Sequence, residues 1–439
     1  MFSALLVTLC ITVSSVLALS TTGSRALFVA DSSFNIDDYT VFLGDLKKRG
    51  FKIDIRSPLD PDLSLFIYGE RNYDHVILTL PSTQKQLGPN LLTKPFLDFI
   101  SKDGNVLILL NPEQHAINSV RDFAREIDIQ LPFRDIKIVD HFNYDADLSP
   151  ELHDVLVLDS SNTVSKSVSA LGGSEKLIYP SGQAFVLGNN DLIVPILRAS
   201  ETAYTFDPTE EMLASESPFA SGTQAYLVAG IQTRNNARAV IVSTDKLFSD
   251  DLLNNEKSAN RKFATDVAKW VFQESGVIRL DSVTHNLINS TEQDPYIYRV
   301  KQDVEYEAKI SEYVNDKWVP YIADDVQLEF TMLDPYYRIT LSPSENEEST
   351  SFKTTFTTPD QHGMFTFKLN YKRTGLSYIE DKRTVVVRHF GHNEFLRSFE
   401  IPNAYPYITS ILVVIGAWFL FILLWIFCGE EKSTTKKTD

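Results

Sequence analysis

Cysteine is almost absent from this 439-residue sequence. The two cysteines, Cys10 and Cys428, lie in the apolar segments near the two ends, and the long segment between them has none. That segment therefore carries no disulfide framework, no cysteine nucleophile and no thiolate metal site. It also shows no internal repeat and no long low-complexity tract. Its stability must come from ordinary hydrophobic cores, for which its length is ample.

Several catalytic and cofactor signatures are missing as well. There is no G-x-G-x-x-G, no Walker sequence, no G-x-S-x-G elbow and no H-E-x-x-H pair, so we expect no nucleotide cofactor and no standard hydrolase centre. The formal net charge of -17 disfavours nonspecific binding to nucleic acid, whose phosphates it would repel.

Long charge-free runs are confined to the two ends. Residues 1–20 carry no charged side chain and read as a signal peptide that lacks a basic start, with cleavage after Ala18 or Ser20. A second run, Ile408–Cys428, would span about 32 Å as a helix, which matches the hydrocarbon core of a bilayer. We place the transmembrane helix at 406–428. A signal peptide followed by this span predicts a single-pass type I membrane protein with a cytosolic tail at 429–439.

The tail ends in Lys-Lys-Thr-Asp. Lys436 and Lys437 have the spacing of the dilysine retrieval signal of endoplasmic-reticulum membrane proteins, although two lysines in a polar tail could also be chance or a lipid-headgroup contact. We interpret the pair as a retrieval signal, which predicts residence in the endoplasmic-reticulum membrane with the large domain in the lumen.

The region between the two end segments has two patterns. From residue 21 to 281, apolar strands alternate with amphipathic helices, which predicts an α/β fold with a parallel sheet covered on both faces. We divide it into an N-terminal lobe at 21–140 and a second lobe at 141–281, and leave open whether these form one domain. From 282 to 400, short strands alternate polar and apolar residues, which predicts a membrane-proximal antiparallel β-sandwich.

Two D-x-D pairs are the best enzymatic lead. Asp60 with Asp62, and Asp145 with Asp147, have the arrangement with which many nucleotide-sugar transferases hold a divalent metal. A metal-dependent glycosyltransferase is therefore one alternative function, although such pairs are common by chance and the Asp140–Asp145 segment also reads as a polar loop. One glycosylation sequon begins at Asn289.

Six segments stand out in order along the chain. They are LSLFIYGERNYDHVILTLPS (63–82), VDHFNYD (139–145), IQTRNNARAVIVSTDKLFSD (231–250), KWVFQESGVIRLDSVTH (269–285), KWVPYIADDVQLEFTMLDPYYR (317–338) and AYPYITS (404–410). These segments resemble the family of the forty-eight-kilodalton subunit of the eukaryotic oligosaccharyltransferase, and the dilysine ending is similar to that of fungal members. The resemblance covers nearly the whole chain.

The resemblance implies a non-catalytic role in protein N-glycosylation. Members of this family work beside a multispanning catalytic subunit, a ribophorin II-like subunit and a small subunit similar to defender against cell death. The complex transfers a dolichol-linked oligosaccharide to asparagine. The resemblance also implies a glutamine-amidotransferase-like fold without the amidase centre, and it offers no catalytic residue, cofactor or metal ligand to carry over.

Residues in the family-like loops are the candidates for a glycan-facing or partner-facing surface. They are Gly69, Tyr73, Asn143, Tyr144, Arg234, Asn235 and Asn236. Because Gly and Asn also occupy turns for backbone reasons, turn chemistry is the alternative reading of these positions. A third function, a lectin-like quality-control receptor, predicts glycan binding without stable association with a transferase.

Overall fold

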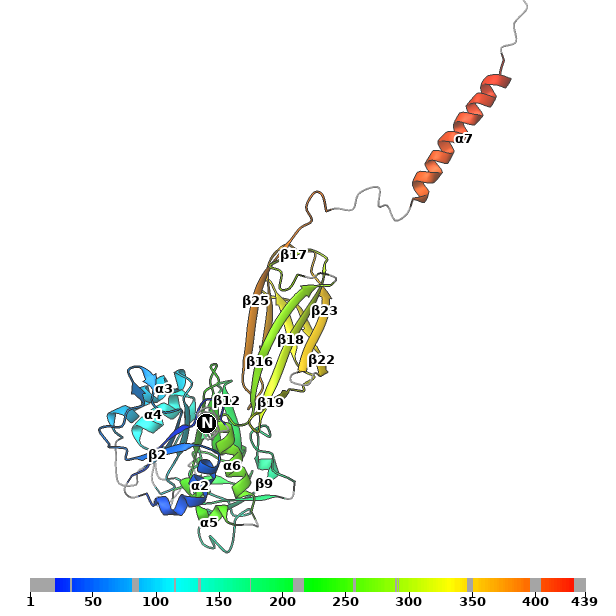
Figure 1. Cartoon of the computed structure of the whole chain (residues 1–439). Helices are drawn as coiled ribbons and strands as arrows, with labels where there is room; N and C mark the ends of the chain where they lie inside the picture. Colours follow the sequence, from blue (N-terminus) through cyan, green and yellow to red (C-terminus); the bar gives the residue numbers. More distant parts are fainter. Residues whose placement is uncertain are drawn as a thin grey trace, which may run out of the picture.

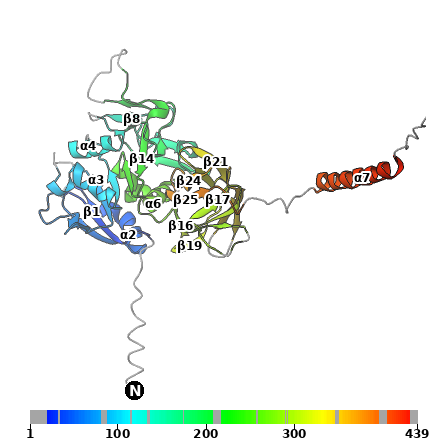
Figure 2. The ribbon, with the colours of Figure 1, turned by 90° about the horizontal axis from the view of Figure 1, so that it is seen from above.

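The computed structural model describes residues 20–429 except 32–33, 81–86, 114–115, 133–135, 174, 208–216, 256–257, 289, 291, 346–349 and 395–403. The predicted signal peptide, Asn289, Lys436 and Lys437 lie outside the described residues, apart from Ser20. Figures 1 and 2 show three parts along the chain: an α/β region, an elongated β domain and a single helix.

A seven-stranded sheet forms the centre of the α/β region. Its strand order is β12-β14-β15-β6-β5-β1-β2. The strands are β1 (Arg25–Val29), β2 (Lys52–Arg56), β5 (His75–Thr79), β6 (Asn105–Leu109), β12 (Ile193–Arg198), β14 (Tyr226–Gln232) and β15 (Arg238–Val242). Strands from both predicted lobes share this sheet, and the division at residue 140 stays a prediction.

The sheet is mixed rather than wholly parallel. The five strands β15, β6, β5, β1 and β2 pair in parallel, as predicted, but β14 runs antiparallel to both β15 and β12. The cause is the short turn at 233–237, which joins β14 and β15 as a hairpin. Parallel neighbours need a crossover of a dozen residues or more.

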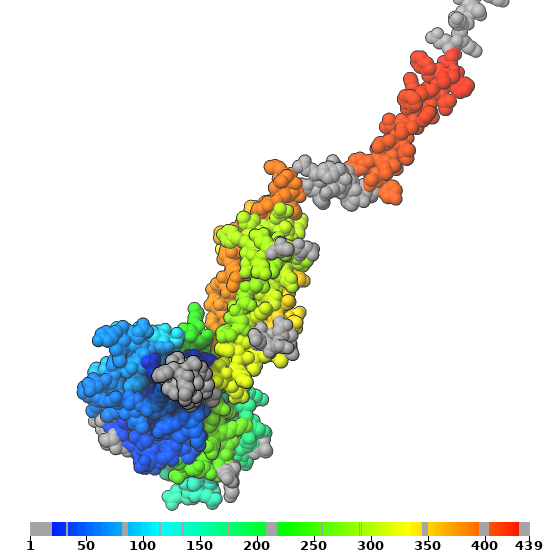
Figure 3. Space-filling view, in the orientation of Figure 1, coloured from blue at the N-terminus to red at the C-terminus, as the bar shows by residue number. Residues whose placement is uncertain are grey.

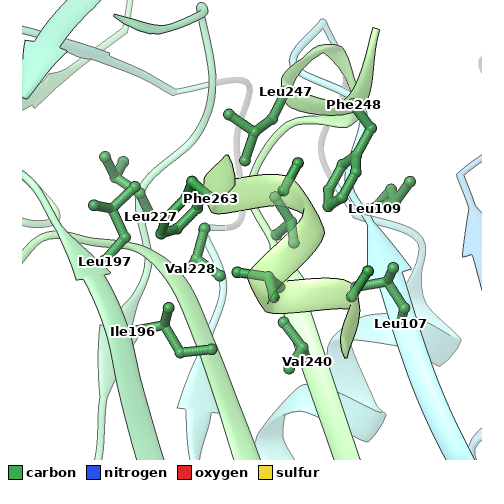
Figure 4. Packing of buried hydrophobic residues seen from close by; sticks show 14 of the residues in the cluster. Leu107, Leu109, Ile196, Leu197, Leu227, Val228, Val240, Leu247, Phe248 and Phe263 are labelled. Atoms are coloured by element: carbon green, nitrogen blue, oxygen red, sulfur yellow. The ribbon is translucent and has the colours of Figure 1, made fainter. Parts of the chain in front are cut away.

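Helices cover both faces of the sheet, and successive side chains of each strand enter opposite cores. Phe28 packs on one side with α2 (Thr40–Lys48) and α6 (Asn260–Val271), whereas Leu27 and Val29 pack on the other with α3 (Thr93–Ser101) and α4 (Asn118–Glu126). Figure 4 shows Phe263 of α6 among Leu197, Leu227 and Val228 in the first of these cores. The continuous apolar strands are explained by burial on both faces.

Small two-stranded sheets and short helices surround this centre. The pairs are β3 (Phe66–Ile67) with β4 (Glu70–Arg71), β7 (Ile129–Gln130) with β11 (Val186–Leu187), β8 (Lys137–Val139) with β13 (Tyr204–Phe206), and β9 (Leu156–Asp159) with β10 (Lys176–Tyr179). The short helices are η1 (Ile36–Tyr39), η2 (Pro89–Leu91), η3 (Ser160–Asn162), η4 (Gly222–Gln224), η5 (Asp245–Phe248) and α5 (Asp250–Leu253). The apolar strand β9 thus lies outside the main sheet.

The β domain consists of two five-stranded sheets that share one core. The first contains β16 (Val277–Leu287), β18 (Asp303–Val314), β19 (Lys317–Pro320), β22 (Ser342–Glu345) and β23 (Thr350–Thr357). The second has the order β17-β25-β24-β20-β21, with β17 (Ile297–Arg299), β20 (Gln327–Thr331), β21 (Pro335–Thr340), β24 (Gly363–Tyr371) and β25 (Ile379–Arg388). One pair, β17 with β25, is parallel, which differs from the predicted antiparallel arrangement.

The C-terminal helix α7 (Tyr405–Phe427) contains 23 residues, has a mean hydropathy of 2.7 in its most apolar window and is entirely exposed. Its length and composition suit a membrane span, at nearly the bounds predicted from the sequence. The chain reaches α7 from the end of the β domain that lies away from the α/β region (Figure 1).

Candidate functional site

A junction of direct hydrogen bonds joins the β domain to the α/β region. These bonds connect the α/β region to the loop at 372–378, which joins β24 and β25. Trp270 Nε1 donates to Gly375 O at 2.8 Å, and Gln232 Nε2 donates to Leu376 O at 2.6 Å. The side chain of Asn236 bonds both backbone groups of Tyr378, accepting at 2.6 Å and donating at 3.1 Å. Asn236 has φ 68°, which asparagine tolerates better than most residues.

Beneath this junction, Arg238 is fully buried on β15 and is held by carbonyl groups. Its guanidinium donates to Trp270 O, Ser275 O and Gly276 O, each at 2.7 Å, and lies over the Trp270 ring. Burial lowers the pKa of Arg238 to about 9. These bonds tie the end of α6 and the start of β16 to the sheet, which gives the junction a rigid base.

A polar groove of about 770 Å³ lies along this junction. One wall comes from the α/β region and the other from the loop at 372–378 and the end of β24. The lining residues are Asn189, Asn190, Asp191, Leu192, Ile193, Val194, Gln232, Thr233, Arg234, Asn370, Lys372, Arg373, Thr374, Gly375, Leu376 and Tyr378.

Three cations reach this groove, and they differ in their partners. Arg373 pairs with Asp325 at 2.5 Å. Among the described residues, by contrast, no carboxylate lies within salt-bridge distance of Arg234 or Lys372. Both side chains are exposed, so they are available to a ligand.

The chemistry of the groove suits a polar ligand with many hydroxyl groups. Asparagine amides both donate and accept, and so complement a hydroxyl group in either role. Arg234 and Lys372 add charged donors, and the half-buried ring of Tyr378 adds an apolar face with a polar tip. No such arrangement could be read from the sequence, because residues about 140 positions apart form the two walls.

The predicted surface residues fall in three separate places. Arg234 lines the groove and Asn236 supports it, while Asn235 bonds the end of α3 through Ile100 O and Ser101 O. Of the seven predicted residues, only Arg234 is in the groove lining, and the role of these residues as a glycan-facing or partner-facing surface stays a prediction. The prediction missed the opposite wall, for which only the polar run Asn370–Thr374 gave a signal.

Gly69 and Tyr73 belong to the β3–β4 hairpin and its exit. Gly69 has φ 87° and its carbonyl oxygen accepts from Lys102, so a glycine suits this turn. The Tyr73 hydroxyl donates to Asp54 Oδ2 at 2.7 Å, and burial together with this carboxylate raises the pKa of Tyr73 to about 12. Both roles are structural.

Asn143 and Tyr144 lie in a loop organised by the buried carboxylate of Asp140. Asp140 accepts hydrogen bonds from Ser200, Thr202 and Asn143. Burial alone would raise the pKa of Asp140, but these bonds stabilise the carboxylate and hold the pKa below its usual range. The ring of Tyr144 stacks on His153 with a centroid distance of 3.9 Å.

The D-x-D pairs form turns. Asp145 Oδ1 accepts from the backbone N–H groups of Asp147 and Leu148, and Asp60 Oδ1 accepts from that of Asp62. Within the described part of the chain, no group of three His, Cys, Asp or Glu side chains is placed to hold a metal ion. Backbone capping thus accounts for both pairs.

Taken together, the structure combines an α/β region, a β domain, a polar groove between them and one helix that is long and apolar enough to span a membrane. The sequence matches the family model described as OST48, N-terminal domain, over residues 17–274, and the OST48 middle domain over residues 285–429. The chain belongs to the OST48 family.

Named relatives match over nearly their full lengths. The dolichyl-diphosphooligosaccharide–protein glycosyltransferase subunit WBP1 of Saccharomyces cerevisiae is 34% identical, with 98% of each chain covered. The subunit wbp1 of Schizosaccharomyces pombe is 34% identical over 97% of each, and the 48 kDa subunit of Caenorhabditis elegans is 32% identical over 94% of this chain and 93% of that protein. Among solved structures, an mmIFT52 N-terminal domain has a TM-score of 0.40 and 15% identity over 56% of this chain and 97% of its own, from which we draw no argument.

Proposed function

We propose that this chain is a non-catalytic subunit of the oligosaccharyltransferase of the endoplasmic-reticulum membrane, which transfers a dolichol-linked oligosaccharide to asparagine in nascent proteins. The observation that carries this proposal is the 34% identity, over 98% of both chains, to a relative named as a subunit of that transferase. The turn roles of Asp60 and Asp145 support a non-catalytic part, because they leave the D-x-D pairs a backbone function.

The proposal includes the topology and the partners. The chain would be a type I membrane protein with α7 as its span, its α/β region and β domain in the lumen, and its dilysine tail in the cytosol. Its partners would be the multispanning catalytic subunit, a ribophorin II-like subunit and a defender-against-cell-death-like subunit. A glycan on Asn289 would face the lumen.

The domain division is also a proposal. The α/β region would be glutamine-amidotransferase-like, with lobes at 21–140 and 141–281, and 282–400 would be a β-sandwich. The parallel strands of the main sheet and the core shared by the two later sheets support it. β16 begins at Val277, slightly before the proposed boundary.

Within this function, the groove would bind the oligosaccharide of the donor. The amides of Asn189 and Asn370 support this role, together with Arg234 and Lys372, which have no carboxylate partner among the described residues. These groups can bond several sugar hydroxyl groups at once. Holding the sugar away from the reacting bond would position the donor without taking part in the chemistry.

The donor KM of the purified transferase tests this role. In the double variant Arg234→Ala/Lys372→Ala, we expect the KM for the dolichol-linked donor to rise about a hundredfold or more, because each of the two charged hydrogen bonds to a ligand contributes about 1.5–3 kcal/mol. The value of kcat should be unchanged, since neither side chain touches the reacting atoms.

Lys382→Ala is the matched control. Lys382 is an exposed lysine on the neighbouring strand β25, paired with Glu380 and outside the groove lining. Its replacement should leave the donor KM as in the wild type. An unchanged KM in the double variant would reject the groove as the donor site, while membership of the complex would be judged separately by co-purification.

A further inference from the structure

Exposed apolar side chains gather at the end of the β domain from which the chain continues to α7. Tyr296 and Ile297 precede and begin β17, Leu333 and Tyr336 flank the turn into β21, and Met364 begins β24. They are 47–102% exposed. In Figures 1 and 3, the chain leaves the β domain toward α7 at the end that is remote from the α/β region.

The outer face of the sheet changes character along its strands. Ile297 pairs with Val386, which pairs with Met364, so these three form one apolar row across β17, β25 and β24. Two residues further along, Thr384 pairs with Thr366, and two further again Lys382 pairs with Lys368. Because side chains alternate between faces, these rows share the outer face. The outer face runs from apolar to hydroxyl to charged with distance from this end, and Lys382 and Lys368 are paired there with Glu380 and Glu329.

Leu333 extends the apolar row and has an unusual backbone. Its φ is 115° and its side chain is fully exposed. Its neighbour Met332 lies against Gly363, where an added Cβ would come within 2.8 Å of the sulfur, so the turn adjoins the start of β24. A bulky residue rarely adopts positive φ, and such strain is typical of functional positions.

The position of α7 limits what this end can face. The carboxylate of Glu394 is held against the β domain by Arg388 at 2.8 Å and Arg299 at 2.9 Å. Tyr405, the first residue of α7, follows eleven positions later, so at full extension the two lie no more than roughly 36–40 Å apart. The chain therefore enters the bilayer-spanning helix from this end of the β domain, and the length of the connection allows this end to reach the bilayer surface.

We propose that this apolar end of the β domain, formed by Ile297, Leu333, Tyr336, Met364 and Val386, rests in the headgroup layer of the bilayer that α7 spans. Apolar side chains enter the boundary of the acyl chains, and tyrosines favour the interface. The order of the rows matches increasing polarity with distance from the membrane. Lys372 lies eight positions from Met364, so the groove would be held roughly 26 Å above this contact.

Nitroxide quenching in lipid nanodiscs tests this contact. The full-length chain, with Cys10→Ser and Cys428→Ser, would carry one cysteine at a time for a fluorescent NBD label, in phosphatidylcholine nanodiscs with or without lipid that bears a headgroup nitroxide. Met364→Cys and Leu333→Cys should both be quenched several-fold more than Lys382→Cys, a control on the same outer face four positions from Val386.

The alternative occupant of the surface is a protein partner. Equal quenching at 364, 333 and 382 would overturn the proposal. The proposal would also be overturned if the fluorescence at 364 and 333 changed only in the presence of co-purified subunits and did not respond to the lipid nitroxide. That result would assign the surface to a protein partner. Using two labelling sites keeps the test valid if one variant does not fold.

Discussion

Asp245 combines a buried carboxyl group with a strong shift in its proton affinity. It follows β15 at the carboxyl end of the parallel strands, where its backbone N–H bonds Leu110 O at 2.8 Å. Burial raises its pKa to about 6, although Lys246 opposes the shift. Among the described atoms, one of its carboxyl oxygens has no hydrogen-bond partner. The folded protein therefore holds this proton more tightly than the unfolded chain.

Stability should depend on this group between about pH 4 and pH 6. Because the folded pKa lies above the unfolded value of 3.8, folding favours the protonated form, and the free energy of unfolding falls as pH rises through this window. Asp245→Asn removes the titration. Relative to the wild type, it should gain about 2 kcal/mol between pH 4 and pH 6.

Urea unfolding of both proteins at several pH values measures this difference. Asp122→Asn, at a side chain that is 58% exposed, is the control for the same carboxyl-to-amide change outside the core. A constant difference between Asp245→Asn and the wild type across this window would show that Asp245 is ionised in the fold.

At the same scale, the sequence could predict single residues of the site but not their neighbours. Arg234 was predicted from its loop, and it does line the groove. Lys372 and Tyr378 were not, because nothing local indicates that their loop meets the turn at 233–237. Arg238 was missed for the same reason, since a charged residue at a strand start reads as solvated until the structure shows three carbonyl partners.

At the scale of elements, the contact between Gly276 and Gly375 sets how closely β16 approaches the loop at 372–378. Gly276 has φ 65°, and an added Cβ would lie 2.4 Å from Gly375 O. Gly276→Ala should therefore destabilise the protein by about 2–4 kcal/mol, through backbone strain and a clash with a backbone atom. The midpoint of thermal unfolding measures this loss.

Gly44→Ala is the opposite control. Gly44 lies inside α2, and nothing lies within 4 Å of an added Cβ. Because alanine favours helix over glycine, this change should stabilise by about 0.5–1 kcal/mol. If Gly276→Ala unfolded at the same midpoint temperature as the wild type, the claim that Gly276 lies in close contact with Gly375 would be wrong.

Hydrophobic patterns predicted most elements because period and length are local. The uniformly apolar α7 appears within one residue of its predicted bounds. Strand direction is not local, so the antiparallel β14 was missed.

At the scale of the whole molecule, the order of parts defines a distance from the membrane. In the proposed arrangement α7 anchors the chain, the β domain acts as a spacer, and the groove lies beyond it (Figure 1). A subunit built this way would hold the sugar of the donor well above the bilayer. The dolichol end of the donor would remain in the bilayer. The separation explains how a non-catalytic subunit could raise the rate of transfer by positioning.

The most direct test of the central claim is the transfer activity that co-purifies with the tagged full-length chain from detergent-solubilised endoplasmic-reticulum membranes. The eluate should contain a multispanning subunit and should transfer oligosaccharide from the dolichol-linked donor to a peptide with an N-x-S/T sequon, whereas the chain freed of its partners should not. Recovery of the chain alone without activity would contradict membership of the complex, and transfer by the isolated chain would contradict its non-catalytic role.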